Sequence, residues 1–92
     1  MSNPGYLTDK DRLLARMNRI EGQVRGIGRM IDEETYCIDV LTQVSAAIAA
    51  LKGVAVELVD DHVRHCVVDA PAEELDEKLS EAVAAIARLT RS

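Results

Sequence analysis

Apolar residues recur at alternating steps of four and three along most of the chain, the spacing of one face of an α-helix. In the first segment, about residues 9–32, they are Leu13, Met17, Ile20, Val24, Ile27 and Ile31. In the second, about residues 36–66, they are Cys37, Leu41, Val44, Ile48, Leu51, Ala55 and Leu58, and the same spacing continues to His62 and His65. The third, about residues 72–90, has Leu75, Leu79, Ala82, Val83, Ile86 and Leu89. The pattern predicts an all-α chain of three helices, the middle one longest, without strands.

Short polar or proline-containing segments separate the three predicted helices. The first break is Asp32-Glu33-Glu34-Thr35, and the second is Asp69-Ala70-Pro71, where proline suits a first helical turn. With 92 residues and neither Trp nor Phe, one chain buries only a limited core. We therefore expect a single helical domain over residues 1–92, with residues 1–8 as a flexible tail, that is stable as an oligomer.

The two cysteines and one histidine lie on the apolar seam of the second segment. In one continuous helix Cys37 and His62 are separated by roughly 37 Å, so one ion cannot reach both in the same chain. Cys66 follows His62 by four residues and lies on the same side of the helix. If two copies pack antiparallel and cross at the Ala-rich stretch near residues 50–51, Cys37 of one chain meets His62 and Cys66 of the other. Twofold symmetry then repeats the site.

Two thiolates and one imidazole suit a soft metal ion of low coordination number. Thiolates favour Cu(I), which accepts three ligands, whereas Zn(II) usually takes a fourth and Ni(II) or Co(II) prefer more nitrogen and oxygen donors. The alternative is that Cys37 and Cys66 are small buried apolar residues and that His62 is merely solvated. His65 lies about 100° around the helix from Cys66 and is better explained without metal.

Charge is unevenly distributed along the chain, whose net charge is −5. Residues 1–30 carry six basic and three acidic side chains, whereas residues 31–92 carry five basic and thirteen acidic ones. Arg12, Arg16 and Arg19 share a helix face away from the main apolar seam. A basic end on an acidic body is compatible with a localised phosphate-binding surface. An ordinary solvated helix face explains the same charges.

The first residues lack the basic start and apolar stretch of a signal peptide, and the uncharged apolar runs are too short to cross a membrane. We therefore expect a cytoplasmic protein without a membrane partner. In that compartment two cysteines indicate metal ligands or reactive thiols rather than a structural disulfide.

Three segments of this sequence resemble the copper-sensing repressors of the CsoR family. They are residues 19–27 (RIEGQVRGI), residues 36–41 (YCIDVL) and residues 62–66 (HVRHC). The first segment marks a wider family that also includes nickel/cobalt, formaldehyde and persulfide sensors. The resemblance implies an antiparallel dimer of long helices that pairs into a flat, four-helix-bundle-like tetramer. It also implies one Cu(I) per subunit between protomers, with Cys37, His62 and Cys66 as ligands, and release of operator DNA when copper binds.

Further residues match positions of that family. Tyr36 and Glu81 correspond to residues thought to link His62 to the DNA-binding change, and a carboxylate on the free imidazole nitrogen would orient the ring. Arg16 matches a DNA-contacting position, and charge and helix face add Arg12, Arg19 and Lys10. A second basic position of some relatives falls here at Gly53, so the neighbouring Lys52 is the candidate for that contact. The family has no helix-turn-helix, and none is visible in this sequence.

Two other functions compete with a Cu(I)-responsive repressor. The first is a repressor of the same fold that senses a persulfide or an aldehyde through its thiols, although a thiol switch does not need His62. The second is a cytoplasmic copper buffer, whose ligands should be exposed near a flexible loop rather than on a packed seam. An enzyme acting on a small-molecule substrate is not expected, because no phosphate loop, acid–base pair or substrate pocket is evident.

Overall fold

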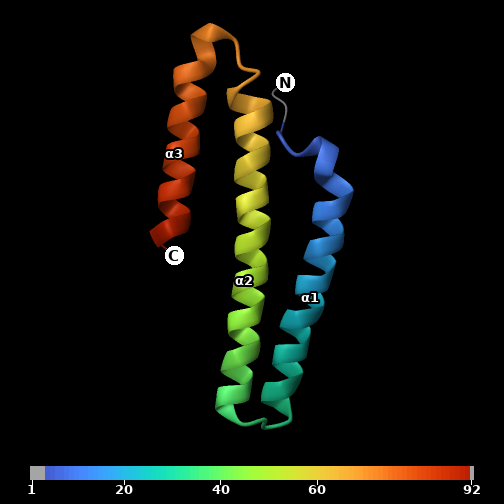
Figure 1. Ribbon diagram of the computed structural model, residues 1–92. Helices are drawn as coiled ribbons and strands as arrows, with labels where there is room; N and C mark the ends of the chain where they lie inside the picture. Colours follow the sequence, from blue (N-terminus) through green and yellow to red (C-terminus); the bar gives the residue numbers. More distant parts are fainter. Residues whose placement is uncertain (1–3, 92) are drawn as a thin grey trace. The chain divides into compact units, whose positions relative to one another are not determined.

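The computed structural model describes residues 4–91, and its elements are helices joined by short connections (Figure 1). A 3₁₀ turn, η1 (Leu7–Asp9), precedes α1 (Lys10–Asp32). The long α2 (Cys37–His62) continues into a π-helical turn, η2 (Val63–Val67). A second 3₁₀ turn, η3 (Ala72–Glu74), leads into α3 (Leu75–Arg91). The described part of the chain contains no strand, so the prediction of three helices with the longest in the middle is confirmed.

The chain forms two compact units that share α2. One unit is residues 11–54, and the other combines residues 4–10 with residues 55–91 among those described. The prediction of a single domain over residues 1–92 with a flexible tail at residues 1–8 stays a prediction. Residues 1–3 of that tail and residue 92 lie outside the described residues.

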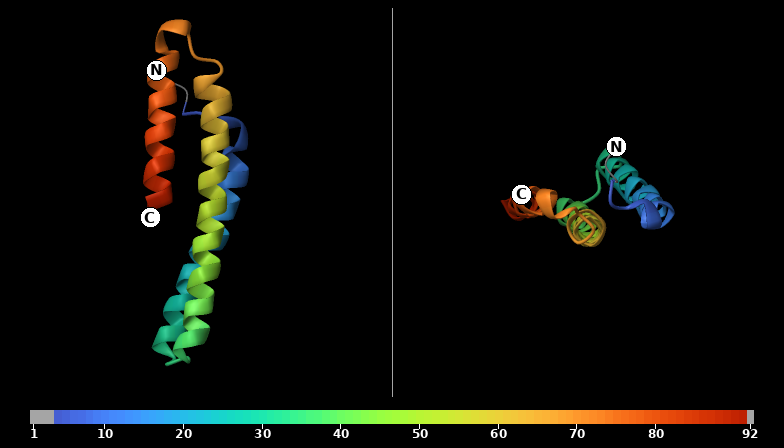
Figure 2. Two further views of the ribbon diagram at one scale, coloured as in Figure 1. Left: turned by 60° about the vertical axis from the view of Figure 1, so that its left-hand side comes forward. Right: turned by 90° about the horizontal axis from the view of Figure 1, so that it is seen from above.

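In the unit of residues 11–54, α1 runs antiparallel to the part of α2 that ends at Val54 (Figure 2). Leu13 and Ile20 of α1 are buried against Val54, and Ala50 packs on this cluster. Leu13 and Ile20 are seven residues apart, two turns along one helix face, which is why the apolar spacing of the sequence brings them together.

The connection between α1 and α2 is a tight turn with one residue in the left-handed region. Glu34 has φ 59°, a backbone conformation that costs a non-glycine residue free energy. The Thr35 N–H donates to the Met30 carbonyl at 2.9 Å, and the Glu33 N–H donates to the Arg29 carbonyl at 2.9 Å. These bonds satisfy carbonyls at the end of α1, which is how a left-handed residue closes a helix.

In the second unit, α3 lies beside the end of α2 and the π-helical turn, where Val67 and Ala82 are buried. The N-terminal segment packs on the same region through Gly5, which is buried and has φ 97°. The φ of Gly5 lies in the region that favours glycine, so this residue suits the turn of the chain at that point.

Many large apolar side chains of the described residues are exposed in the single chain. They include Val24, Ile31, Leu41, Ile48, Leu51, Leu79, Val83 and Ile86. Most of them belong to the apolar stripes that predicted the helices. Exposed apolar surface of this extent is typical of a protein that associates.

The helix Cys37–Val67 is long and apolar enough to cross a membrane by length and composition. The expectation that every apolar run is too short to cross a membrane is therefore wrong in terms of length and composition. Such a helix is weak evidence for a membrane span, because the core helix of a soluble protein passes the same test. Here the uncharged run of residues 40–51 ends at Lys52, and a lysine in the middle of a span costs about 3 kcal/mol.

Candidate functional site

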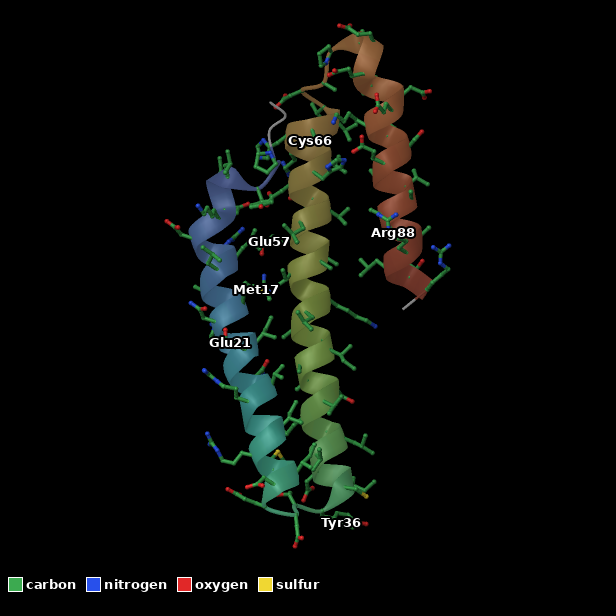
Figure 3. The ribbon with its side chains drawn as sticks, turned by 180° about the vertical axis from the view of Figure 1, so that it is seen from behind. Met17, Glu21, Tyr36, Glu57, Cys66 and Arg88 are labelled. Atoms are coloured by element: carbon green, nitrogen blue, oxygen red, sulfur yellow. The ribbon has the colours of Figure 1, made fainter. Side chains whose placement is uncertain are left out.

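Two of the three predicted metal ligands lie together at the end of α2. His62 is its last residue and Cys66 lies in the π-helical turn that follows (Figure 3). Both are half-buried, and both lie close to Gly5: a Cβ placed there would be 3.0 Å from Cys66 Sγ and 3.6 Å from His62 Cα. The N-terminal segment therefore covers the side of α2 that carries the thiol and the imidazole. π-Helical turns are frequent at functional sites, and this one places the thiol.

The His62 ring presents a buried nitrogen without a partner. Its Nε2 atom is inaccessible to solvent and has no hydrogen-bond partner in the described part of the chain. A buried imidazole nitrogen left unpaired is costly, so a ligand or a second chain that satisfies it would stabilise the protein. A neutral imidazole nitrogen is also a common metal ligand.

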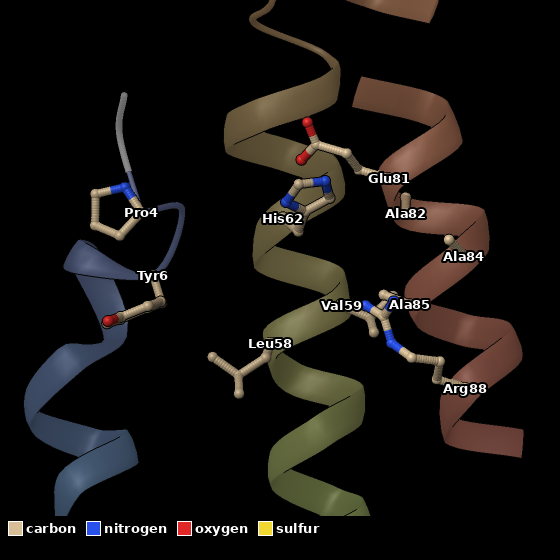
Figure 4. A pocket seen from close by; sticks show the side chains of 10 residues that line it. All are labelled: Pro4, Tyr6, Leu58, Val59, His62, Glu81, Ala82, Ala84, Ala85 and Arg88. Carbon is tan, nitrogen blue, oxygen red and sulfur yellow. The ribbon is translucent and has the colours of Figure 1, made fainter. Parts of the chain in front are cut away.

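Glu81 reaches the same place from α3. Figure 4 shows its carboxylate beside the His62 ring. The Glu81 side chain is half-exposed, and its Oε1 lies 3.8 Å from Lys78 Nζ in an i,i+3 pair. The structure thus brings Glu81 near His62, but the carboxylate does not bind Nε2.

A cavity of about 500 Å³ opens beside these two residues. Figure 4 shows its walls, formed by the N-terminal segment, α2 and α3. Its lining is mostly apolar, with His62, Glu81 and Arg88 as the polar side chains other than Tyr6. An apolar wall limits access of water to one side of the imidazole ring.

Asp61 is a buried carboxyl that the sequence analysis did not identify. It is 3 % exposed, and its Oδ2 has no hydrogen-bond partner in the described residues. Burial raises the pKa of Asp61, and a side-chain hydrogen bond with Asp9 together with the charges of Asp9, Asp60 and Glu57 raises it further. The only signal in the sequence was a pair of adjacent aspartates at the end of an apolar helix.

The third predicted ligand, Cys37, is the first residue of α2, so it stands at the opposite end of that helix from His62. It is an exposed free thiol, and the neighbouring Tyr36 is 69 % exposed at the turn before α2 (Figure 3). The described residues of one chain contain no group of three side chains that could hold a metal ion. The structure therefore brings His62 and Cys66 together but not Cys37.

The basic residues of α1 form a second candidate site. Arg12, Arg19 and Lys10 are exposed, and Arg16 is half-buried. Arg16 and Arg19 line a groove of about 490 Å³ together with Ile20, Gln23 and Ala50. Lys52 is exposed on α2, and a Cβ on its neighbour Gly53 would lie 2.7 Å from Arg16 Nη2. The sequence did not point to Gln23, because an uncharged side chain adds nothing to a charge count.

The sequence model of one protein family, described as metal-sensitive transcriptional repressor, matches residues 9–88. The chain belongs to this family. It is thus a transcription regulator and not an enzyme. Its sequence is 58 % identical over 91 residues to the copper-sensing transcriptional repressor RicR of Mycobacterium tuberculosis (strain ATCC 25618 / H37Rv), covering 96 % of this chain and 95 % of RicR.

Two solved structures show the same fold. The copper-sensing repressor CsoR with Cu(I) from Geobacillus thermodenitrificans NG80-2 is similar with a TM-score of 0.82 and 39 % identity, covering 90 % of this chain and 88 % of that one. The nickel-responsive transcriptional regulator InrS has a TM-score of 0.73 and 39 % identity, covering 85 % of this chain and 89 % of that one. The fold therefore occurs with more than one metal signal.

Proposed function

We propose that this chain is a Cu(I)-responsive transcriptional repressor, which binds operator DNA without metal and leaves it when Cu(I) is bound. The observation that carries the proposal is the unpartnered, buried Nε2 of His62 on the same end of α2 as Cys66. This end of the helix offers one nitrogen and one sulfur, and a second sulfur from another chain would complete a set suited to Cu(I). The similarity to RicR and to the Cu(I)-bound CsoR supports the same metal.

Cys37 completes the site from a second subunit. Because Cys37 and His62 begin and end α2, an antiparallel pair of these helices places Cys37 of one subunit at the His62 end of the other. The exposed apolar residues of α1 and α2 supply surface for such a pairing. We propose one Cu(I) per subunit, in dimers that pair into tetramers.

Cys37 of one subunit and His62 and Cys66 of its partner would hold Cu(I), which would tie the two subunits together when bound. The donor set fits this ion, because it has two thiolates, one imidazole and an apolar wall beside the ring. We assign Glu81 to orient the ring, because its carboxylate lies beside the imidazole from a different helix. We assign Tyr36 to the same link between the metal site and the DNA-binding change, because it directly precedes Cys37.

DNA binding is assigned to basic side chains of α1 and to Lys52 of α2. Arg16 is the central contact, and Arg12, Arg19, Lys10 and Lys52 are further contacts. Operator duplex DNA is the partner, and the protein acts in the cytoplasm. Phosphate contacts make such binding weaken steeply with salt. By linkage, DNA binding lowers the affinity for Cu(I) by the same factor by which Cu(I) lowers the affinity for DNA.

One competing function keeps the DNA-binding role but makes the thiols the signal. Neither cysteine forms a disulfide in the described structure, and a persulfide or aldehyde sensor also requires reduced thiols. A protein with His62→Ala that still leaves DNA when treated with a persulfide donor, and a wild type that ignores Cu(I), would favour this function. A copper buffer would bind Cu(I) but would bind no duplex DNA at all.

Fluorescence anisotropy tests the proposal directly. The probe is a duplex selected by this protein from a random library, and the titration is done without oxygen. We expect Cu(I) to weaken wild-type binding by about 5- to 150-fold, the usual range of allosteric coupling, and to leave His62→Ala binding unchanged. Wild-type binding that Cu(I) does not alter would contradict the proposal.

A further inference from the structure

One backbone position of α2 lies directly under the guanidinium of Arg16. A Cβ built on Gly53 would be 2.7 Å from Arg16 Nη2 and 3.8 Å from Arg16 Cζ. The first distance is shorter than real Cβ contacts allow, so the side chain of Arg16 can rest there only because residue 53 has none. Both residues belong to the unit of residues 11–54, so the contact lies within one compact body.

The glycines of α1 make no comparable contact. A Cβ on Gly22, Gly26 or Gly28 would meet nothing within 4 Å in the described chain. Glycine inside a helix destabilises it relative to alanine, so its presence calls for a reason. At Gly53 the structure gives that reason, which is room for the arginine.

Arg16 lies at a groove whose other polar side chains come from the same face of α1. The groove is lined by Arg16, Arg19 and Gln23, with Ile20 and Ala50 as its apolar members. Positions 16, 19 and 23 are three and four residues apart, so they follow one another along the helix. Two guanidinium groups and an amide can all donate hydrogen bonds, which suits the oxygens of a phosphodiester.

We propose that Gly53 is a positioning residue for DNA binding, which lets the Arg16 guanidinium lie against α2 at the groove where Arg19 and Gln23 also face a DNA phosphate. The inference rests on the proposed function. It assigns to Gly53 a role that a charge count cannot reveal. It also adds Gln23 to the residues that contact the DNA backbone.

A side chain at position 53 has opposite effects on the helix and on the arginine. Alanine favours the helix over glycine. The atom it would meet is the end of a flexible side chain, so Arg16 can move away without disturbing α2. Gly53→Ala should therefore raise the melting temperature while it weakens DNA binding. A general packing defect would lower both.

The test measures DNA affinity against salt concentration for the full chain with the selected duplex. The variants are Gly53→Ala, Arg16→Ala and the double variant, with Gly28→Ala as the control for helix propensity. We expect Gly53→Ala to weaken binding and to reduce the slope of log K against log salt by about 0.9 for each phosphate that the protein no longer neutralises. In the Arg16→Ala background, adding Gly53→Ala should change neither affinity nor slope. Gly28→Ala should bind DNA as the wild type does.

The outcomes separate this inference from the proposed function. If Gly53→Ala binds DNA as well as or better than wild type, or weakens binding equally without Arg16, the inference is overturned while the repressor role stands. If the wild type binds no duplex or ignores Cu(I), the proposed function fails first. Sedimentation of each variant checks that assembly is unchanged, and Gly53→Ser, which carries the same Cβ, repeats the measurement with a second side chain.

Discussion

Two adjacent residues at the end of α2, Asp61 and His62, each bury a polar atom that has no partner in the described chain. The sequence singles out His62 as a candidate ligand, because it lies on the apolar seam four residues before a cysteine. The burial of Asp61 could not be predicted, because it depends on the N-terminal segment, with Gly5 close to the Asp61 backbone and Asp9 hydrogen-bonded to its side chain. Contacts between segments distant in sequence leave no periodic signal.

The raised pKa of Asp61 predicts a pH-dependent stability. A carboxyl whose folded pKa lies above its ordinary value of 3.8 contributes stability below that value, and this contribution is lost as the pH rises through the folded pKa. At about pH 7 the buried charge is therefore unfavourable. We expect Asp61→Asn to raise the urea midpoint at neutral pH, with the advantage disappearing below pH 3.8.

Asp60→Asn is the matched control for this measurement. Asp60 is exposed and pairs with Arg64 at 3.0 Å, an i,i+4 contact of little energetic value at a surface. Its replacement should shift the midpoint far less. Equal shifts for the two variants, or an Asp61→Asn advantage that persists in acid, would show that burial of the charge is not the cause. All midpoints are compared at one protein concentration, because assembly contributes to stability.

At the scale of elements, the three helices follow from the apolar spacing and the two breaks, and their predicted bounds agree with the structure to within a few residues. The π-helical turn at Val63–Val67 was not predictable, because one wider turn hardly changes the spacing of apolar residues. The left-handed Glu34 was also missed, since glutamate is not a residue that marks such a turn.

The α1–α2 turn offers a test of local conformation. Glycine adopts the left-handed region without the cost that glutamate bears, which is roughly 1–2 kcal/mol. We expect Glu34→Gly to stabilise the protein by about 1 kcal/mol in urea unfolding, after the greater chain entropy of glycine is subtracted. Glu33→Gly, at a neighbouring position without positive φ, should destabilise it. A loss of stability in Glu34→Gly would contradict the left-handed conformation of residue 34 in this turn.

The N-terminal segment offers a second test at this scale. Gly5→Ala forces a side chain into the left-handed region and within 3.0 Å of Cys66 Sγ, so the segment should detach more often. A penalty of about 1 kcal/mol corresponds to about fivefold more of the open form, and alkylation of Cys66 should accelerate by that factor. The rate is measured in a Cys37→Ser background, with Pro4→Ala as the control. An unchanged rate would mean that Gly5 does not cover the thiol.

At the scale of the whole molecule, the described residues of one chain contain no group of three side chains that could hold a metal ion. The sequence places Cys37 and His62 one helix length apart, and the structure shows them as the first and last residues of α2. Periodicity predicts which face of the helix is apolar, but it does not determine how many copies cover that face. The tetramer and the DNA-bound arrangement therefore follow from family resemblance and not from the apolar spacing.

Subunit mixing tests the central claim most directly. Cys37→Ala and the double variant His62→Ala/Cys66→Ala each lack part of every site, so neither should hold Cu(I) against a competing chelator. When equal amounts are unfolded and refolded together without oxygen, random pairing makes about half of the dimers mixed. In each mixed dimer one of the two sites has all three ligands. We predict recovery of about a quarter of the wild-type Cu(I) capacity, with two sulfurs and one nitrogen by X-ray absorption. No recovery in the mixture, or full tight binding by either variant alone, would contradict a site shared between subunits.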